Sequence, residues 1–75
     1  MIKVYSKTGC GACAMTKKLM KDNGIPFKEI DGGKDPGRQA VVDMGYRALP
    51  VVVLEDGDHF QGFRPDRILQ LKPTR

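Results

Sequence analysis

The stretch Cys10-Gly11-Ala12-Cys13 holds the only two cysteines of the 75-residue chain. It follows an apolar run, Ile2 to Tyr5, that is typical of a β-strand, and it opens a segment with helical periodicity. Cys-X-X-Cys pairs at the start of a helix are typical of reversible dithiols. We therefore take a redox-active cysteine pair as the first hypothesis for this chain.

The two cysteines are expected to differ in their roles. In the first turn of a helix, the sulfur of Cys10 would face unpaired backbone N–H groups and the positive end of the helix dipole, which favour the thiolate. Cys13 lies three residues further on, so its sulfur can approach that of Cys10 on the same side of the helix. We expect Cys10 to attack a target disulfide and Cys13 to release the mixed disulfide. Lys7 places a cation near the reactive sulfur, where it would either favour the thiolate or remain a solvated surface residue.

Three other interpretations of the pair stay open. A structural disulfide from Cys10 to Cys13 would close a very short loop and would remove little chain entropy. Half of a zinc site would need two further ligands, and the chain offers only His59 besides its carboxylates. The pair could also be two unrelated buried thiols.

Length and composition indicate a single small domain, residues 1–75. The chain is 40% hydrophobic and 29% charged, and its core is near the lower size limit for unaided folding. No apolar run approaches the roughly 20 residues of a membrane span, and Met1 to Tyr5 does not resemble a signal peptide, because a charge interrupts it. We expect a cytoplasmic protein, and in a reducing compartment a cysteine pair is more often catalytic than structural.

The net charge is +4, from 13 Lys and Arg residues against 9 Asp and Glu residues. The positive charges are spread along the chain without a recognisable nucleic-acid motif or a platform of aromatic residues. Attraction to an acidic protein partner suits this charge equally well. We expect a monomer that binds neither nucleic acid nor membrane.

The first half of the chain predicts a strand, a helix and a strand over residues 2–6, 11–23 and 27–31. Gly24 is expected to end the helix as a left-handed cap, and the hydroxyl of Thr8 is a candidate cap at its start. The apolar and small residues at three- and four-residue spacing are Ala12, Cys13, Met15, Thr16, Leu19 and Met20. We expect Met15 and Met20 to fill the core rather than to bind a metal.

The second half predicts a helix, two strands and a last helix. Asp35 is expected to cap a short helix that begins at Pro36 and stops at Gly45. Residues 50–54 form a continuous β-branched run, typical of a strand that is covered on both faces. Asp56-Gly57 signals a two-residue hairpin to an antiparallel strand over residues 58–61, where His59 is expected at the surface.

The last helix is expected to begin at Pro65. Its apolar residues are Ile68, Leu69 and Leu71, and Pro73 lies beyond its end. The full order is therefore β-α-β-α-β-β-α. A strand, a crossover helix and a strand imply a right-handed parallel pair, and the later hairpin adds antiparallel strands. The fold class is α/β, with a mixed four-stranded sheet flanked by helices.

With this element order around the cysteine pair, the chain resembles thioredoxin-fold proteins of the glutaredoxin type, and most of all the NrdH redoxins. Three segments carry the resemblance, which covers nearly the whole chain. They are residues 5–13, Ala48-Leu49-Pro50-Val51-Val52, and Gly62-Phe63-Arg64-Pro65-Asp66-Arg67. The chain departs from the pattern at Phe60-Gln61, where NrdH redoxins commonly carry Trp, and at Gly11-Ala12, which is often bulkier.

The resemblance implies further site residues. It implies a cis Leu49-Pro50 bond beside the cysteines, where Leu49 and Pro50 would dock an incoming polypeptide like an added strand. Phe63, Arg64 and Pro65 occupy a turn that contains Gly-Gly in glutathione-using glutaredoxins. Poor glutathione binding is therefore implied, and Phe63 with Arg64 would shape the surface for the protein partner.

The implied function is that of a small dithiol carrier, a thiol-disulfide oxidoreductase without a metal or a bound organic cofactor. It would take electrons from thioredoxin reductase and pass them to a ribonucleotide reductase of class Ib, in deoxyribonucleotide synthesis. A glutathione-dependent glutaredoxin that uses the same cysteines is one alternative. A metal-carrying dimer, to which each chain supplies Cys10 and Cys13, is another.

Overall fold

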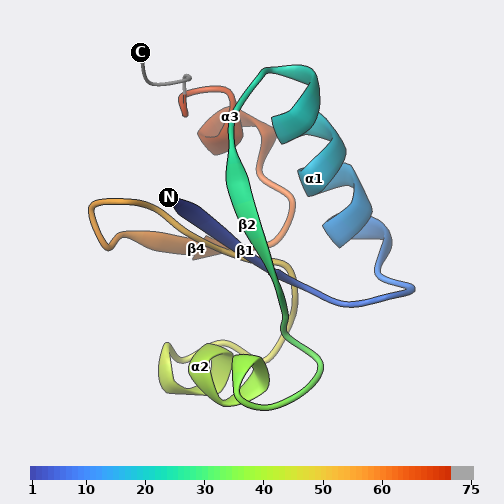
Figure 1. The fold of residues 1–75 in the computed structure, drawn as a ribbon, viewed down its shortest axis with the longest axis vertical. Coiled ribbons are helices and arrows are strands. Elements are labelled where there is room, and N and C mark those ends of the chain that lie inside the picture. Colours follow the sequence, from blue (N-terminus) through green and yellow to red (C-terminus); the bar gives the residue numbers. More distant parts are fainter. Residues whose placement is uncertain (72–75) are drawn as a thin grey trace.

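A mixed four-stranded sheet in the order β2-β1-β3-β4 lies between the helices (Figure 1). The computed structural model describes residues 1–71. The strands are β1 (Ile2–Ser6), β2 (Phe27–Asp31), β3 (Val51–Val53) and β4 (His59–Gln61), and the helices are α1 (Gly11–Asp22), α2 (Gly37–Asp43) and α3 (Pro65–Ile68). Strand β1 pairs with β2 in parallel and with β3 antiparallel, and β4 is antiparallel to β3. The predicted element order and sheet type are confirmed.

The sheet is covered on both faces, since α2 lies on one side of it and α1 and α3 lie on the other (Figure 1). Successive side chains of a strand point to opposite faces of the sheet, so β1 and β3 contribute side chains to two separate cores. One core, beneath α1 and α3, consists of Val4, Met20, Ile25, Val52, Phe60 and Ile68. The other, beneath α2, consists of Tyr5, Val41 and Val51. This two-sided burial accounts for the continuous apolar run that predicted β3.

The start of α1 differs from the prediction. Cys10 itself is the N-cap residue, and its side chain accepts a hydrogen bond from the backbone N–H of Cys13. The prediction that Thr8 caps this helix was therefore wrong. The left-handed cap at the other end is confirmed, because Gly24 has φ +68° and follows the C-cap residue Asn23.

The start of α2 also differs. Pro36 is the N-cap residue and Gly37 is the first helical residue, so Asp35 does not cap the helix. The N-cap residue Pro36 makes no side-chain cap hydrogen bond, and the Asp35-Pro36 peptide bond is cis. The helix ends at Asp43, slightly before the predicted stop.

The hairpin between β3 and β4 is one residue longer than predicted. The N–H of Leu54 donates to the carbonyl of Asp58 at 2.8 Å, which leaves residues 55–57 as the loop. The N–H of Gly57 donates back to the Leu54 carbonyl at 3.1 Å, and Gly57 has φ +93°. A turn followed by a left-handed glycine is the usual geometry of a three-residue hairpin loop.

Met15, which was predicted in the core, is 54% exposed. Leu69, which was predicted only as an apolar residue of the last helix, is 50% exposed. The buried positions of α1 are Cys13, Thr16 and Met20, and Met15 lies about 200° around the helix from Cys13. Met15 therefore faces away from the sheet. Leu69 follows the end of α3. The prediction that Pro73 lies beyond the end of this helix falls outside the described residues.

The prediction of His59 as a surface residue was wrong in part. His59 is half-buried, and its Nδ1 lies 2.7 Å from the hydroxyl of Tyr46. The two rings also meet edge to face, with centroids 5.3 Å apart. The contact ties strand β4 to the segment that follows α2.

In the part of the chain that the structure describes, none of the helices is long and apolar enough to cross a bilayer.

Thr16→Val is expected to stabilise the fold by about 1 kcal/mol. The side chain of Thr16 is fully buried, and its Oγ1 has no hydrogen-bond partner among residues 1–71. Valine has nearly the same shape and removes the unsatisfied hydroxyl. Thermal unfolding should show the transition raised by roughly 4–8 °C. The same change at exposed Thr8 is the control, with an expected effect within about 0.5 kcal/mol; a Thr16→Val protein less stable than the parent would mean that the hydroxyl is satisfied.

Candidate active site

The cysteine pair lies where the chain leaves the central strand β1 and enters α1 (Figure 1). Cys10 is half-buried and Cys13 is completely buried, and both are free thiols. The sulfur of Cys10 can therefore be reached from solvent, whereas the sulfur of Cys13 is buried. This arrangement suits an attacking thiol and a resolving thiol.

The surroundings of Cys10 favour its thiolate. Burial alone would raise the pKa of Cys10, but the Cys13 thiol and the Cys13 N–H outweigh it, so the pKa lies below its ordinary value. The N–H of Cys13 lies 3.2 Å from Sγ of Cys10. The charge of Lys7 and the N–H of Ala12 lower the pKa further. These are the effects expected at a helix N-terminus with a neighbouring cation.

The surroundings of Cys13 have the opposite effect. Burial, together with the side chain and charge of Cys10, raises the pKa of Cys13 to about 11. At neutral pH the pair therefore consists of one activated sulfur and one protonated thiol. A proton held on Cys13 is available to stabilise a thiolate on Cys10.

The segment around Pro50 is adjacent to the cysteines. The Leu49-Pro50 bond is cis, as the resemblance implied. The carbonyl oxygen of Leu49 accepts a long hydrogen bond, at 3.8 Å, from Sγ of Cys10. The Leu49 side chain packs with the core beneath α2, against Tyr5 and over Gly32. Leu49 thus presents its backbone to the reactive sulfur while its side chain lies in the core.

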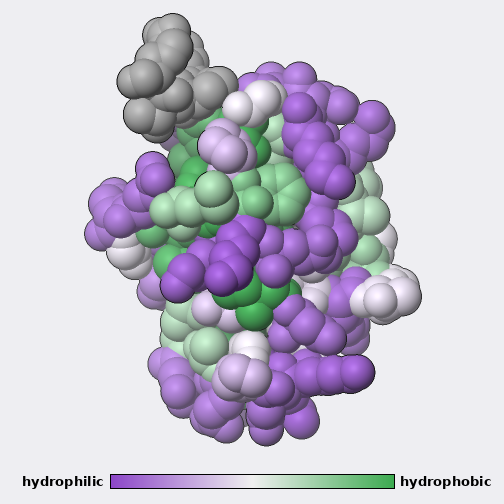
Figure 2. All heavy atoms as spheres, in the orientation of Figure 1, coloured by the Kyte–Doolittle hydropathy of each residue, from purple (hydrophilic) through white to green (hydrophobic). Residues whose placement is uncertain are grey.

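A hollow of about 470 Å³ lies on the α2 side of this segment. It is lined by Lys7, Gly32, Gly33, Arg38, Val41, Val42, Tyr46, Arg47, Ala48 and Leu49. Three of these residues are cations and none is acidic. In the view of Figure 2, hydrophilic residues cover most of the lower part of the molecule, where α2 lies.

Sequence reasoning missed Arg38, Tyr46 and Arg47 in this hollow. The three residues lie far from the cysteines in the chain and form no motif with Lys7. Only the packing of α2 against the sheet brings them to it.

Phe63 and Arg64 lie apart from this hollow. Phe63 packs at the border of the core beneath α1 and α3, and it lines a shallow hollow with Met15, Lys18, Leu19 and Asp22. Arg64 is exposed, and its Nε donates to the carbonyl of Gln61 at 3.3 Å. The predicted binding residues therefore do not form one pocket. The turn is nevertheless tied to the cis-proline segment, because the N–H of Gly62 donates to the Pro50 carbonyl at 2.8 Å.

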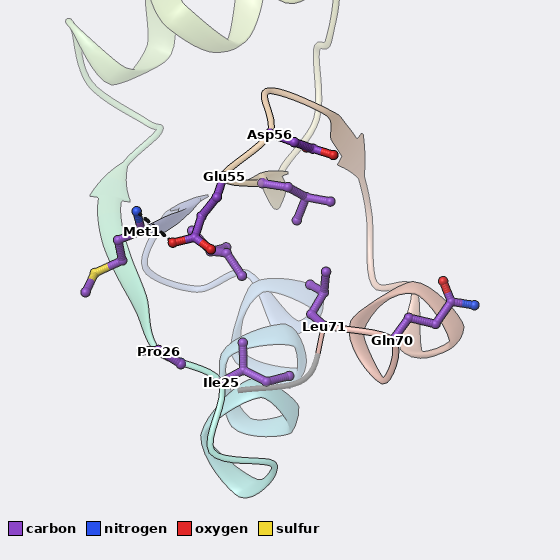
Figure 3. A pocket seen from close by; sticks show the side chains of 9 residues that line it. Met1, Ile25, Pro26, Glu55, Asp56, Gln70 and Leu71 are labelled. Atoms are coloured by element: carbon purple, nitrogen blue, oxygen red, sulfur yellow. Dashed lines mark ion pairs between the residues drawn. The ribbon is translucent and has the colours of Figure 1, made fainter. Parts of the chain in front are cut away.

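Another hollow, of about 420 Å³, lies at the opposite end of β1 (Figure 3). Ile25 and Leu71 line it, and at its border the Met1 ammonium pairs with Glu55 at 3.2 Å. Neither cysteine reaches this hollow, so it is separate from the candidate site.

Within residues 1–71, no group of three or more His, Cys, Asp or Glu side chains is arranged to hold a metal ion.

Comparison with known proteins gives consistent matches. Residues 2–60 match the glutaredoxin family. The glutaredoxin-like protein NrdH of Lactococcus lactis subsp. cremoris (strain MG1363) is 40% identical over 72 residues, which cover 95% of this chain and 99% of the relative. The protein of the same name from Escherichia coli (strain K12) is 37% identical over 74 residues, which cover 97% of this chain and 90% of the relative.

A solved structure is equally similar. The NrdH-redoxin of Escherichia coli matches with a TM-score of 0.88 and 36% identity, covering 99% of this chain and 97% of that chain. That protein is described as glutaredoxin-like, with a thioredoxin-like activity profile. The likeness extends over both cores and over the whole candidate site.

Proposed function

The chain belongs to the glutaredoxin family, and within it to the NrdH redoxins, and we propose that Cys10 and Cys13 carry the electrons of its thiol-disulfide oxidoreductase activity. The observation that supports this most directly is the contrast between the two sulfurs. Cys10 is accessible with a lowered pKa, whereas Cys13 is buried with a raised pKa.

The exchange proceeds in two steps. The Cys10 thiolate attacks one sulfur of a partner's disulfide, a Cys10–partner disulfide forms, and the other partner sulfur leaves as a thiolate. Cys13 then loses its proton and attacks Sγ of Cys10, and the second partner sulfur leaves with its electron pair. The partner gains two electrons and the carrier ends with a Cys10–Cys13 disulfide. No metal or bound organic cofactor takes part.

The cis-proline segment is the proposed docking site for the partner polypeptide. The Leu49 carbonyl lies against Cys10, so an extended chain that pairs with the Leu49 backbone would bring its own sulfur to the reactive one. Pro50 is fully buried and fixes this segment against the sheet. Lys7 borders the same site, whereas Phe63 and Arg64 would shape the partner surface on the α1 side.

The proposed donor is thioredoxin reductase, and the proposed acceptor is a class Ib ribonucleotide reductase, in the cytoplasm. The thioredoxin-like activity profile of the related Escherichia coli protein supports this donor. The turn before α3 supports it as well, since bulky Phe63 stands there, and Pro65 has no N–H to donate to a carboxylate of glutathione.

A reduction assay tests the donor. With NADPH and thioredoxin reductase, the protein should reduce a protein disulfide in many turnovers. With glutathione, glutathione reductase and NADPH, the rate should be at least about tenfold lower, because the turn before α3 offers one anion-binding N–H fewer. The Cys10→Ser variant is the blank in both systems. Fast turnover with glutathione and none with thioredoxin reductase would identify a glutathione-dependent glutaredoxin instead.

A further inference from the structure

A polar hollow of about 300 Å³ lies between the start of α1 and strand β2. It is lined by Ser6, Lys7, Thr8, Lys17, Glu29 and Asp31. Cys13 is not among the lining residues, but the backbone of Lys7, which forms part of the wall, lowers the pKa of Cys13. The hollow therefore borders a segment that acts on the buried thiol.

Lys17 is held in place at this hollow. Its Nζ lies 2.6 Å from Oε2 of Glu29, and the hydroxyl of Ser6 donates to the same oxygen at 2.7 Å. Ser6 is 1% exposed and the side chain of Lys17 is 25% exposed. The ammonium group is thus fixed against the end of the sheet rather than extended into water.

Lys17 is also a close neighbour of Cys13 on α1. The two residues are four positions apart, so their side chains leave the same face of the helix. Lys17 is not among the apolar and small residues that predicted α1. The structure nevertheless turns it towards β2, through its pairing with Glu29.

The resolving step gives this position a chemical use. Cys13 can attack only as a thiolate. Burial and the neighbouring Cys10 hold the pKa of Cys13 at about 11, against the opposing effect of the Lys17 charge. A fixed cation beside a buried thiol increases the small thiolate fraction from which the attack occurs.

We infer that the Lys17 ammonium, held by Glu29 and Ser6, favours the thiolate of Cys13 in the resolving step. This role presupposes the dithiol exchange proposed above. The Cys13 proton passes to water, and the thiolate attacks Sγ of Cys10. The Cys10–Cys13 bond forms, the Cys10–partner bond breaks, and the partner sulfur leaves with the electron pair and takes up a proton from water.

Other charged groups lie around the hollow. Lys7 lines it from the loop before α1, and Glu29 and Asp31 line it from β2. The charge of Lys21 on α1 acts on Glu29. Hydrogen bonds from Lys17 and Ser6 lower the pKa of Glu29, so its carboxylate is ionised at neutral pH. Glu29 therefore serves as an anchor for Lys17 rather than as the base that accepts the proton.

The reaction of the reduced protein with 5,5′-dithiobis(2-nitrobenzoate) separates the two steps. Attack by Cys10 releases one thionitrobenzoate, and resolution by Cys13 releases the second. Lys17→Met should slow the second release roughly three- to tenfold at neutral pH and move its pH midpoint upward, because the cation no longer favours the thiolate. The first release should change less than about twofold.

Three further variants complete the test. Lys17→Arg keeps the charge and should restore most of the second rate. Lys18→Met is the matched control, because Lys18 is the adjacent exposed lysine and pairs with Asp22 at 3.0 Å, and its second rate should equal that of the parent. Lys17→Gln replaces Lys17→Met if circular dichroism shows the latter unfolded.

An unchanged second rate across the pH range in the Lys17 variants would overturn the inference. Equal slowing by Lys18→Met would overturn it too, because the effect would then belong to helix charge in general. If the parent protein itself released no second thionitrobenzoate, the failure would lie with the proposed function and not with Lys17.

Discussion

Cys13→Ser is expected to turn the carrier into a protein that remains linked to its partners. Cys10 keeps its accessible position, so the first attack still occurs. The buried group that should displace the partner is then a hydroxyl, which does not break a disulfide under these conditions. Turnover with protein disulfides should fall by roughly two orders of magnitude or more. Non-reducing electrophoresis and mass spectrometry should show the covalent adduct.

Cys10→Ser is the matched comparison. The remaining thiol, Cys13, is completely buried and its pKa is raised to about 11, so it should capture no partner. Turnover should be lost to the same extent but without any adduct. Adducts that accumulate with Cys10→Ser and not with Cys13→Ser would reverse the roles assigned to the two sulfurs.

Gly37→Ala is expected to destabilise the fold by about 3 kcal/mol or more. Gly37 is the first residue of α2 and is buried where this helix meets the end of β2. A methyl group there would overlap the carbonyl oxygen of Asp31 and lie 3.2 Å from Cγ2 of Ile30. The oxygen belongs to the backbone, so the helix would have to move away from the sheet. Thermal unfolding should show the transition lowered by 10 °C or more, about 4–8 °C for each kcal/mol.

Gly11→Ala is the control for this prediction. Gly11 is likewise the first residue of its helix, but apart from its chain neighbours and the nearby backbone of α1, no atom lies within 4 Å of the position that its methyl group would take. Alanine is the better helix former, so stability should stay equal or rise by up to about 1 kcal/mol. Equal behaviour of the two variants would show that the approach of Gly37 to Asp31 is not tight in solution.

The sequence predicted the architecture because the hydrophobic periodicity of each element agrees with the positions of the Gly and Pro residues at its ends along most of the chain. Strand β1 alternates between the two cores, and Gly24 and Pro65 stand at helix ends where backbone geometry requires such residues. The cysteine spacing predicted that one sulfur would lie at a helix start. These features depend only on the backbone geometry of neighbouring residues, so they can be read from the sequence.

What the sequence missed depends on how elements pack. Met15 is apolar, yet the direction in which α1 faces the sheet leaves it in solvent. The three cations of the hollow beside Leu49 come from three separate segments, and the pairing of Lys17 with Glu29 joins α1 to β2. The residue pattern along the chain does not predict such contacts between separate elements, because they depend on how each helix is placed against the sheet.

The contrast between a half-buried Cys10 and a completely buried Cys13 also bears on oxidative damage. Hydrogen peroxide would reach Cys10 first and convert its thiolate to a sulfenic acid. The Cys13 thiol would then condense with that sulfenic acid, release water and form a reducible disulfide before a second peroxide could produce an irreversible sulfinic acid. The same geometry that makes one sulfur the point of entry thus shields the protein from permanent loss of its activity.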